Sequence, residues 1–384
     1  MKLTQLLFPE AAWELSLNNP IGIYIHVPFC ESKCAYCDFY SYKSNEITYS
    51  NYTAALCQHI FAAGVQLSVF ADTLYFGGGT PSLHGGKRIA KIIKSSKQAF
   101  NIKDAEITVE VNPADNLFND FKIMADAGVN RISVGVQSAI DSELKSLSRR
   151  HSVGDVIRTV NDAKNAGINN ISVDLMIGIP HQTFDSLKTS LDFILGLDIN
   201  HISCYMLKIE PNTLFGNINI DELNLPDNDT VADMYIYVSN YLKEHGFEHY
   251  EISNFALDGF RSKHNLKYWQ DKEYLGFGPA AHSFLNNKRF YFERDTEKYI
   301  DHPEIIHDGF GGNSDEYIML RLRLSDGINY KEYEDKFGKA FDKKIISKAK
   351  ELEKYGLIEF NDNGFCLTLN GFLVSNTCIS KLLS

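Results

Sequence analysis

Short apolar runs alternate with longer amphipathic stretches along the first half of this 384-residue chain. The short runs are rich in β-branched residues, as buried strands are. The longer stretches repeat apolar residues with helical spacing, and several end at Gly. We therefore expect strands over Ile21–Val27, Thr73–Phe76, Glu106–Val111, Arg131–Val136, Ile171–Ile177 and His201–Ile209. We expect helices between them, over Tyr52–Phe70, Arg88–Phe100, Val153–Ala166 and Phe184–Leu195.

Three of the expected strands open with nearly the same phrase. It reads Asn130-Arg-Ile-Ser, Asn169-Asn-Ile-Ser and Asn200-His-Ile-Ser. An echo at this spacing indicates repeated βα units, and hence a parallel sheet covered by helices. Both a barrel and an open doubly wound sheet satisfy that pattern.

Polar residues and glycines at the ends of the expected strands favour the barrel. A cysteine loop follows the first strand, Gly77–Pro81 follows the second, and Glu110, Gln137 and Asp174 lie near the ends of the next three. A barrel gathers the carboxyl ends of its strands around one mouth, where these groups would meet. Six units are fewer than the eight of a complete barrel. The predicted fold class is therefore α/β, a partial (β/α)6 barrel with a lateral opening.

The alternation stops after about residue 212, and the C-terminal part has a pattern of its own. A helix is expected over Val231–Glu244, and helices over Glu316–Leu324 and Lys343–Tyr355 precede a hairpin with a turn at Asn361–Gly364. Helices and a hairpin of this kind predict a small winged-helix-like domain. Residues 313–384 hold 11 Lys and Arg against 11 Asp and Glu. That balance favours a structural or protein-contact role over DNA binding. The predicted divisions are 1–20, an N-terminal segment; 21–250, the barrel; 251–312, an extension; and 313–384, the C-terminal domain.

Charge and cysteine usage exclude several classes of protein. A formal net charge of -11 argues against a nucleic-acid surface. Seven cysteines, three of them in one loop, suit a reducing compartment better than a disulfide framework. The N-terminus resembles no secretion signal, and no apolar run is long enough for a transmembrane segment. We expect a cytoplasmic protein; the sequence leaves open peripheral membrane association and whether the chain is a monomer or a homodimer.

The loop carrying Cys30, Cys34 and Cys37 has the spacing C-x3-C-x2-C. Three thiolates in one loop can hold three irons of a [4Fe–4S] cube and leave the fourth iron free to bind a small molecule. A zinc knuckle or ordinary buried thiols are the alternatives, although structural zinc normally takes a fourth Cys or His. The other four cysteines lie in apolar surroundings and are expected to be core residues: Cys57, Cys204, Cys366 and Cys378.

The cysteine spacing, with Tyr36 before the last thiol, resembles the signature of the radical S-adenosylmethionine (SAM) superfamily. An ordered set of further motifs resembles the HemN/HemW family, from about residue 20 to the C-terminus. These motifs are Tyr24-Ile-His-Val-Pro-Phe-Cys30, Gly77–Pro81, Glu110-Val-Asn-Pro113, Gly135-Val-Gln137-Ser, Asp174-Leu-Met-Ile-Gly-Ile-Pro180, Tyr250-Glu-Ile-Ser-Asn-Phe-Ala256 and Gly276-Phe-Gly-Pro-Ala-Ala-His282. The resemblance implies a partial barrel with a smaller C-terminal domain, a [4Fe–4S] cluster and SAM as cofactors.

The resemblance also implies roles for single residues. Cys30, Cys34 and Cys37 would be the metal ligands, and Tyr24, Gly78 and Glu110 match positions that contact a first SAM. Positions lining a second SAM site in the coproporphyrinogen-oxidising branch are matched by Tyr36, Gly79, Thr80, Gln137, Arg149 and Asp174. Alone, each of these has a plainer explanation. Gln137 and Asp174 could cap helices, and Arg149 could be a surface cation.

Local residues separate the two branches of the family. The oxygen-independent coproporphyrinogen III dehydrogenase branch continues its loop with a fourth cysteine, where this chain has Phe39. The HemW branch has Phe there and adds H-N-x-x-Y-W, present here as His264–Trp269. HemW proteins are regarded as haem chaperones, so the resemblance implies haem as ligand, unidentified haem-acceptor proteins as partners and His264 as an axial ligand. A packed helix-start histidine is the plainer explanation of His264. The dehydrogenase is the alternative function, with a zinc or redox regulator third; catalytic residues are not assigned.

Overall fold

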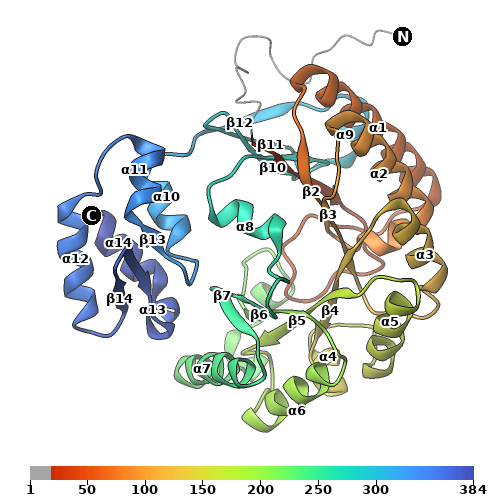
Figure 1. Cartoon of the computed structure of the whole chain (residues 1–384). Coiled ribbons are helices and arrows are strands. Elements are labelled where there is room, and N and C mark those ends of the chain that lie inside the picture. The colour runs from red at the N-terminus through yellow and green to blue at the C-terminus, as the bar shows by residue number, and fades with distance from the viewer. Residues whose placement is uncertain (1–18) are drawn as a thin grey trace.

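The computed structural model describes residues 19–384. Six parallel strands form a curved sheet in which each strand pairs with the next one along the chain (Figure 1). They are β1 (Ile21–Val27), β2 (Ala71–Gly78), β3 (Glu106–Val111), β4 (Arg131–Gln137), β5 (Asn170–Ile177) and β6 (His201–Met206). All six expected strands are therefore present, in the order that makes the predicted partial barrel.

Helices cover the outer face of this sheet (Figure 1). They are α1 (Glu46–Leu67), α2 (Gly86–Phe100), α3 (Phe118–Ala127), α4 (Asp141–Ser146), α5 (Val153–Asn165), α6 (Phe184–Leu195) and α7 (Asn228–Glu244), with a short 3-10 turn at Pro81–His84. The amphipathic spacing explains the packing: in α2, for example, Ile89, Ile92 and Ile93 are buried. The sequence-based predictions omitted α3 and α4 and began α1 six residues late, because its N-cap, Asn45, precedes a polar first turn.

The alternation of side chains along the strands divides the barrel into two compartments. In β2, Leu74 and Phe76 are fully buried apolar residues of the main core, between sheet and helices. The residues that alternate with them along the strand point to the opposite side and face the barrel interior. They are Thr73, Tyr75 and Gly77. The residues that face this interior are largely polar, so it is suited to bind a ligand and does not form a second apolar core.

The segment after the sixth unit extends the same sheet on both sides. On one side β7 (Glu248–Glu251) and β8 (Asn254–Ala256) follow β6; on the other β9 (Tyr274–Phe277) pairs in parallel with β1. Next to β9 lie β10 (His282–Leu285), β11 (Lys288–Phe292) and β12 (Ile305–Phe310), with α9 (Thr296–Asp301) before β12. The boundary expected at residue 250 falls inside β7, and the extension at 251–312 adds strands to the barrel sheet.

The C-terminal domain combines helices with a three-stranded antiparallel sheet. It contains α10 (Ser314–Arg321), β13 (Ile328–Asn329), α11 (Tyr330–Phe337), α12 (Lys343–Glu353), β14 (Ile358–Asn361), β15 (Gly364–Leu367), α13 (Leu369–Leu373) and α14 (Ser375–Leu383). The expected hairpin turn is confirmed by the pairing of Asn361 with Gly364. This arrangement is the predicted winged-helix-like fold.

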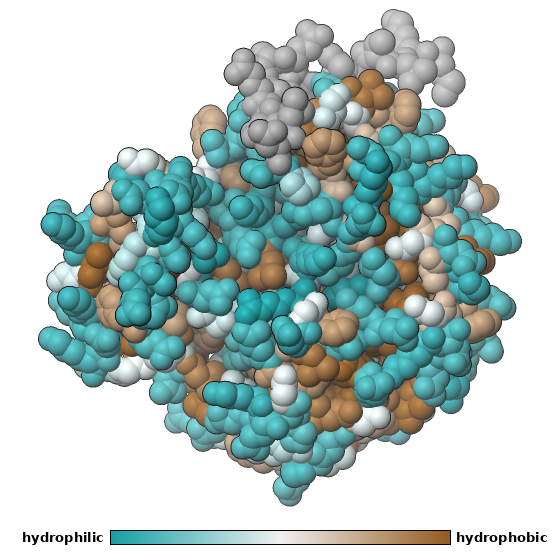
Figure 2. Space-filling view, in the orientation of Figure 1, coloured by the Kyte–Doolittle hydropathy of each residue, from teal (hydrophilic) through white to brown (hydrophobic). Residues whose placement is uncertain are grey.

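The face of the molecule drawn in Figure 2 is mostly polar. On the face drawn in Figure 2, hydrophilic residues predominate over the C-terminal domain, and hydrophobic residues gather below the centre, over the β4–β6 side of the barrel. Within residues 19–384, no helix combines the length and the apolar character that crossing a bilayer requires.

Candidate functional site

The cysteine loop begins directly after β1 and is fastened at its base. Tyr42 N–H donates to the Pro28 carbonyl oxygen, and Cys30 N–H donates to that of Tyr42, both at 3.0 Å. Phe29, between them in the chain, is fully buried and packs against the Tyr49 ring at 4.6 Å between centroids. This anchor fixes the start of the loop. The three thiols beyond it stay partly exposed and form no disulfide.

The middle of the cysteine loop is held from two other strand ends. Ala35 N–H donates to the Leu147 carbonyl oxygen at 3.4 Å, and Phe215 N–H donates to that of Ala35 at 2.9 Å. Ala35, Leu147 and Phe215 also belong to a small apolar cluster separate from the main core. Contacts with the segments after β4 and β6 thus turn the loop across the barrel mouth.

A cavity of about 570 Å³ opens at the carboxyl ends of the strands. Its volume falls within the range of roughly 300–1,000 Å³ that is usual for small-molecule sites. Eleven of the thirteen predicted site residues line it: Cys30, Cys34, Tyr36, Cys37, Gly78, Gly79, Thr80, Glu110, Gln137, Arg149 and Asp174. The convergence expected from the strand-end positions is therefore present in the structure.

The glycine loop after β2 is required by close packing against β1. Gly78 has φ +111°, and a Cβ atom there would lie 2.6 Å from the His26 ring. A Cβ on Gly79 would lie 2.6 Å from the Phe29 carbonyl oxygen. Both contacts are far below van der Waals distance, so this turn needs glycine for its own fold. The tight packing places the Gly78 N–H at the cavity wall, where it donates to Glu110 Oε2 at 3.2 Å.

Thr80 links the glycine loop to the cysteine loop. Its Oγ1 atom lies 3.4 Å from Cys30 Sγ and accepts a hydrogen bond from Asn112 Nδ2 at 2.8 Å. Asn112 lines the cavity and comes from the loop after β3. The Cys30 thiol, after β1, is thus positioned by Thr80, which is held in turn by Asn112 from the loop after β3.

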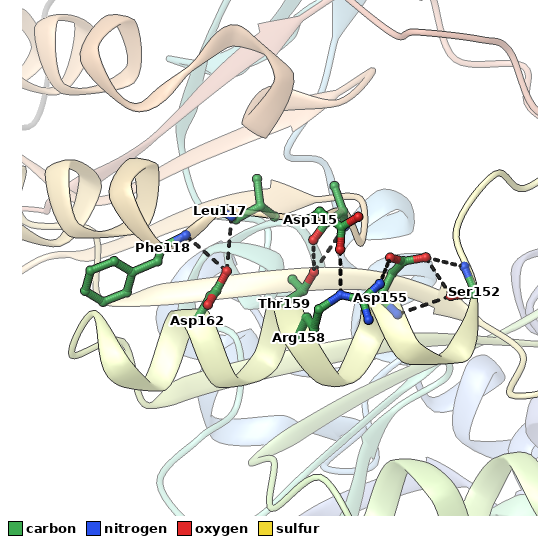
Figure 3. A network of polar contacts seen from close by, with 9 residues as sticks. Asp115, Leu117, Phe118, Ser152, Asp155, Arg158, Thr159 and Asp162 are labelled. Carbon is green, nitrogen blue, oxygen red and sulfur yellow. Dashed lines mark hydrogen bonds and ion pairs between the residues drawn. The ribbon is translucent and has the colours of Figure 1, made fainter.

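The loop after β3 is itself tied to α5, as Figure 3 shows. Asp162 Oδ2 accepts hydrogen bonds from Leu117 and Phe118 N–H, both at 3.1 Å. Arg158 forms an ion pair with Asp115 at 2.5 Å. These contacts fix the loop to a helix outside the barrel and so hold the asparagine that supports Thr80.

The opposite wall carries charged groups. Arg149 Nη2 donates to the Gly135 carbonyl oxygen at 2.6 Å, and Nη1 donates to Cys34 Sγ at 3.4 Å. Its Nε atom is buried and has no hydrogen-bond partner among residues 19–384. Asp174 accepts from Ser133 Oγ at 3.1 Å, and burial raises the pKa of Asp174. Arg149 is therefore no free surface cation but part of the cavity wall.

Helix capping does not explain Gln137 or Asp174. The N-caps of the next helices are Ile140 for α4 and Thr183 for α6, and Asp174 lies within β5. Gln137 has φ +66°, a conformation that is uncommon outside glycine and is often found at functional sites. Both residues face the cavity.

Two predicted site residues do not line the cavity. The Tyr24 hydroxyl bonds with His26 Nδ1 at 3.0 Å, and its ring lies below Gly77 and close to Glu110. His264 lies deeper, on α8 (Lys263–Trp269), the helix inside the ring of strands in Figure 1. The prediction of His264 at the site is therefore not matched by its position.

The environment of His264 is that of a packed interior residue. It is 1% exposed; Nδ1 bonds with Thr73 Oγ1 and Nε2 with the Tyr268 hydroxyl, each at 2.8 Å. Both ring nitrogens are thus occupied, and burial lowers the pKa of His264 to about 3. An axial ligand needs a free ring nitrogen that haem can reach, so the role that the resemblance implied for His264 would require one of these hydrogen bonds to break.

Sequence reasoning missed several residues of the site. Ser133, Asn112, Tyr205 and Met206 line the cavity, and Tyr75 bonds to Glu110 from below. Strand alternation could have found Ser133, which shares a face with Gly135 and Gln137. The cavity also reaches Phe39, Lys208 and Arg294 at its rim.

The residues present fit the implied cofactors. Three thiols on one anchored loop are a donor set suited to an iron–sulfur cluster with one iron left open. A buried carboxylate, a glycine loop and a guanidinium line the adjoining cavity and suit a zwitterionic ligand. Of the other cysteines, Cys204, Cys366 and Cys378 are buried as expected, whereas Cys57 is only partly buried.

Comparison with known proteins gives the family. Residues 24–194 match the radical SAM superfamily, and residues 315–374 match the HemN C-terminal domain. The protein named heme chaperone HemW from Bacillus subtilis is 35% identical over 374 residues, which cover 94% of this chain and 98% of that protein. This chain belongs to the HemW family of radical SAM proteins.

Other relatives extend the same result. The heme chaperone HemW of Lactococcus lactis is 32% identical, over 96% of this HemW-family chain and 98% of its own. The mitochondrial radical S-adenosyl methionine domain-containing protein 1 of Mus musculus is 36% identical, over 96% and 88%. Coproporphyrinogen III oxidase (HemN) of Escherichia coli superposes with a TM-score of 0.81 and 21% identity, covering 94% of this chain and 90% of that one. This last likeness confirms the fold.

Proposed function

We propose that this protein is a haem chaperone of the HemW type, which binds haem and passes it to acceptor proteins in the cytoplasm. The observation that carries the proposal is the similarity to curated HemW chaperones over nearly the whole chain. Phe39 supports it, because a phenylalanine stands where the dehydrogenase branch has a fourth cysteine.

The proposal includes a [4Fe–4S] cluster held by Cys30, Cys34 and Cys37. When bound, the cluster would supply an iron without a protein ligand, which the amino and carboxylate groups of SAM could coordinate. Glu110 is suited to accept hydrogen bonds from SAM hydroxyl or ammonium groups, since it lines the cavity. Arg149 lines the same cavity, and its guanidinium is suited to pair with a carboxylate.

The rim of the cavity supports haem as the second ligand. Phe39 is 67% exposed, Tyr205 41% and Met206 39%, so apolar and aromatic surface faces solvent beside the cavity. Flat aromatic and thioether groups pack well against a porphyrin. Lys208 and Arg294, at the same rim, could pair with its carboxylates. We therefore place haem at the mouth and not beside His264.

Oxidative decarboxylation of coproporphyrinogen III is the second candidate. It is favoured by the fold shared with HemN and by the cavity residues that match its second SAM site. The missing fourth cysteine counts against it, and we propose no dehydrogenase activity.

One experiment separates the two functions. Anaerobically reconstituted protein is titrated with haem and, separately, incubated with SAM, a reductant and coproporphyrinogen III. We expect a saturable haem spectrum with no release of carbon dioxide. Conversion to protoporphyrinogen would overturn the chaperone proposal, and so would failure of the iron- and sulfide-containing protein to bind haem.

A further inference from the structure

A column of stacked rings stands inside the barrel below the cavity. The His264 ring stacks on Tyr75 with centroids 5.1 Å apart and an interplanar angle of 24°. Tyr24 stacks beside both, at 6.3 Å from Tyr75 and 6.4 Å from His264. At the top of this column the Tyr75 hydroxyl donates to Glu110 Oε1 at 2.9 Å. The column therefore ends on a carboxylate that faces the cavity.

Helix α8 holds the bottom of the column in place. Glu106, the first residue of β3, accepts hydrogen bonds from Lys263 N–H at 3.2 Å and His264 N–H at 3.1 Å. Lys267 forms an ion pair with Asp72 at 2.7 Å, at the start of β2. Since these partners belong to the amino ends of the strands, α8 closes the barrel floor opposite the mouth.

Glycine in β1 permits this close approach. A Cβ atom on Gly22 would lie 2.9 Å from Lys267 Cδ and 3.3 Å from His264 Cε1. A strand glycine without a turn often marks such contact with another segment. The His264 ring thus packs against β1 on one side and against the Tyr75 ring on the other. These two contacts fix the orientation of the His264 ring.

We propose that Tyr75, supported from below by His264, is a positioning residue that fixes the Glu110 carboxylate for SAM bound in the cavity. This inference rests on the proposed function, because it assumes that SAM occupies the cavity. Both Glu110 oxygens are then fixed, one by Tyr75 and the other by the Gly78 N–H at 3.2 Å. In this arrangement His264 of α8 acts on the cofactor site through Tyr75, without touching the cofactor.

The protonation of Glu110 gives the proposal a specific signature. Burial, and secondly the nearby charge of Asp174, raise the pKa of Glu110 to about 7. The hydrogen bonds from Tyr75 and Gly78 and the charge of Arg131 oppose this rise. The other titratable groups facing Glu110 are the phenols of Tyr24, Tyr205 and Tyr268.

Loss of the Tyr75 hydroxyl should therefore change the pH at which SAM binds. The hydrogen bond from Tyr75 lowers the pKa of Glu110, so its loss raises that pKa. Glu110 would then keep its proton to a higher pH, and its carboxylate form would be reached only above that pH. A hydrogen bond to a charged group corresponds to about one pKa unit. We expect the pH midpoint of SAM affinity in Tyr75→Phe to lie about one unit above that of wild type, with similar affinity at high pH.

The test measures SAM binding by anaerobic calorimetry on cluster-loaded protein between pH 5.5 and 9. Comparing variant with wild type at each pH removes the titration of SAM itself. Tyr317→Phe is the matched control: it is a buried tyrosine of α10 whose hydroxyl has no hydrogen-bond partner among the described residues. An equal midpoint in Tyr75→Phe and wild type would overturn the inference. Absence of SAM binding by wild type would instead overturn the proposed cofactor, so the two failures are distinguishable.

His264→Ala tests the support below Tyr75. We expect unchanged iron and sulfide content, because the cysteine loop lies at the other end of the barrel, and SAM affinity reduced several-fold at every pH. A folded His264→Ala protein with wild-type SAM affinity would remove His264 from the positioning unit, and Tyr75→Phe remains decisive if His264→Ala does not fold.

Discussion

Arg149 Nη1 lies 3.4 Å from Cys34 Sγ, so a guanidinium contacts one of the three thiols directly. A positive charge beside a cluster ligand stabilises the more reduced, more negative state of an iron–sulfur cluster. The same side chain is tied to the Gly135 carbonyl oxygen at 2.6 Å, which holds it against the sulfur.

Replacing Arg149 by Gln should therefore make the cluster harder to reduce. We expect a midpoint potential lower by about 60 mV, which corresponds to roughly 1.4 kcal/mol for one electron. An anaerobic redox titration followed by electron paramagnetic resonance measures it. Arg150→Gln is the control, because Arg150 pairs with Glu31 at 2.9 Å on the surface and is 60% exposed. Equal shifts of the midpoint potential in Arg149→Gln and Arg150→Gln would show that the loss of one positive charge, and not the contact with Cys34, lowers the potential.

The cysteines provide the second prediction. Cys30→Ala, Cys34→Ala and Cys37→Ala should each retain less than about a tenth of the wild-type iron and sulfide, since two thiolates cannot anchor the cube. Cys57→Ala should retain all of it, because Cys57 lies on α1 and its sulfur faces the Lys91 carbonyl oxygen at 4.0 Å. Iron and acid-labile sulfide analysis decides the question. Full retention in all three loop variants would exclude this cluster site.

The third prediction concerns the glycine turn. Gly78→Ala should lower the free energy of unfolding by about 2 kcal/mol more than Gly167→Ala. Gly78 has φ +111° and Gly167 has φ +94°. Because both angles are positive, an added Cβ destabilises the fold by about 1–2 kcal/mol at either position. Only Gly78 adds a clash, with the His26 ring, since nothing lies within 4 Å of a Cβ at Gly167. Urea unfolding of the two variants measures the difference, and equal values would show that the ring moves aside freely.

Much of the fold follows from local patterns. The six barrel strands were predictable because each is a β-branched run followed by an amphipathic helix, and their ends carry the residues that meet in the cavity. Strands β9 to β12 were not, since they are short and most of them mix polar or charged residues with aromatic and apolar ones. Their pairing depends on β1, which is about 250 residues away in sequence.

The position of His264 could not be deduced from its neighbours in sequence. A histidine followed by tyrosine and tryptophan suits a haem ligand and a packed helix equally well. The structure distinguishes the two through Thr73, which is 191 residues away in the chain and forms a hydrogen bond with the His264 ring. By contrast, Gln137 was found because strand ends converge in any barrel, whatever the details of packing, whereas Arg149 was found only through the resemblance to the family.

The last prediction follows from that position. If haem binds at the cavity mouth, His264→Ala should leave haem affinity within about twofold of wild type, because the ring is buried and both nitrogens are bonded. Phe39→Ala should weaken haem binding by roughly three- to tenfold through loss of an exposed aromatic face at the mouth. Titration of each variant, followed by the haem absorbance band, gives both affinities. Loss of haem binding in a correctly folded His264→Ala protein, with Phe39→Ala unaffected, would return haem to α8. It would also require that helix to leave the barrel floor when haem binds, since no ring nitrogen of His264 is free while Thr73 and Tyr268 hold it.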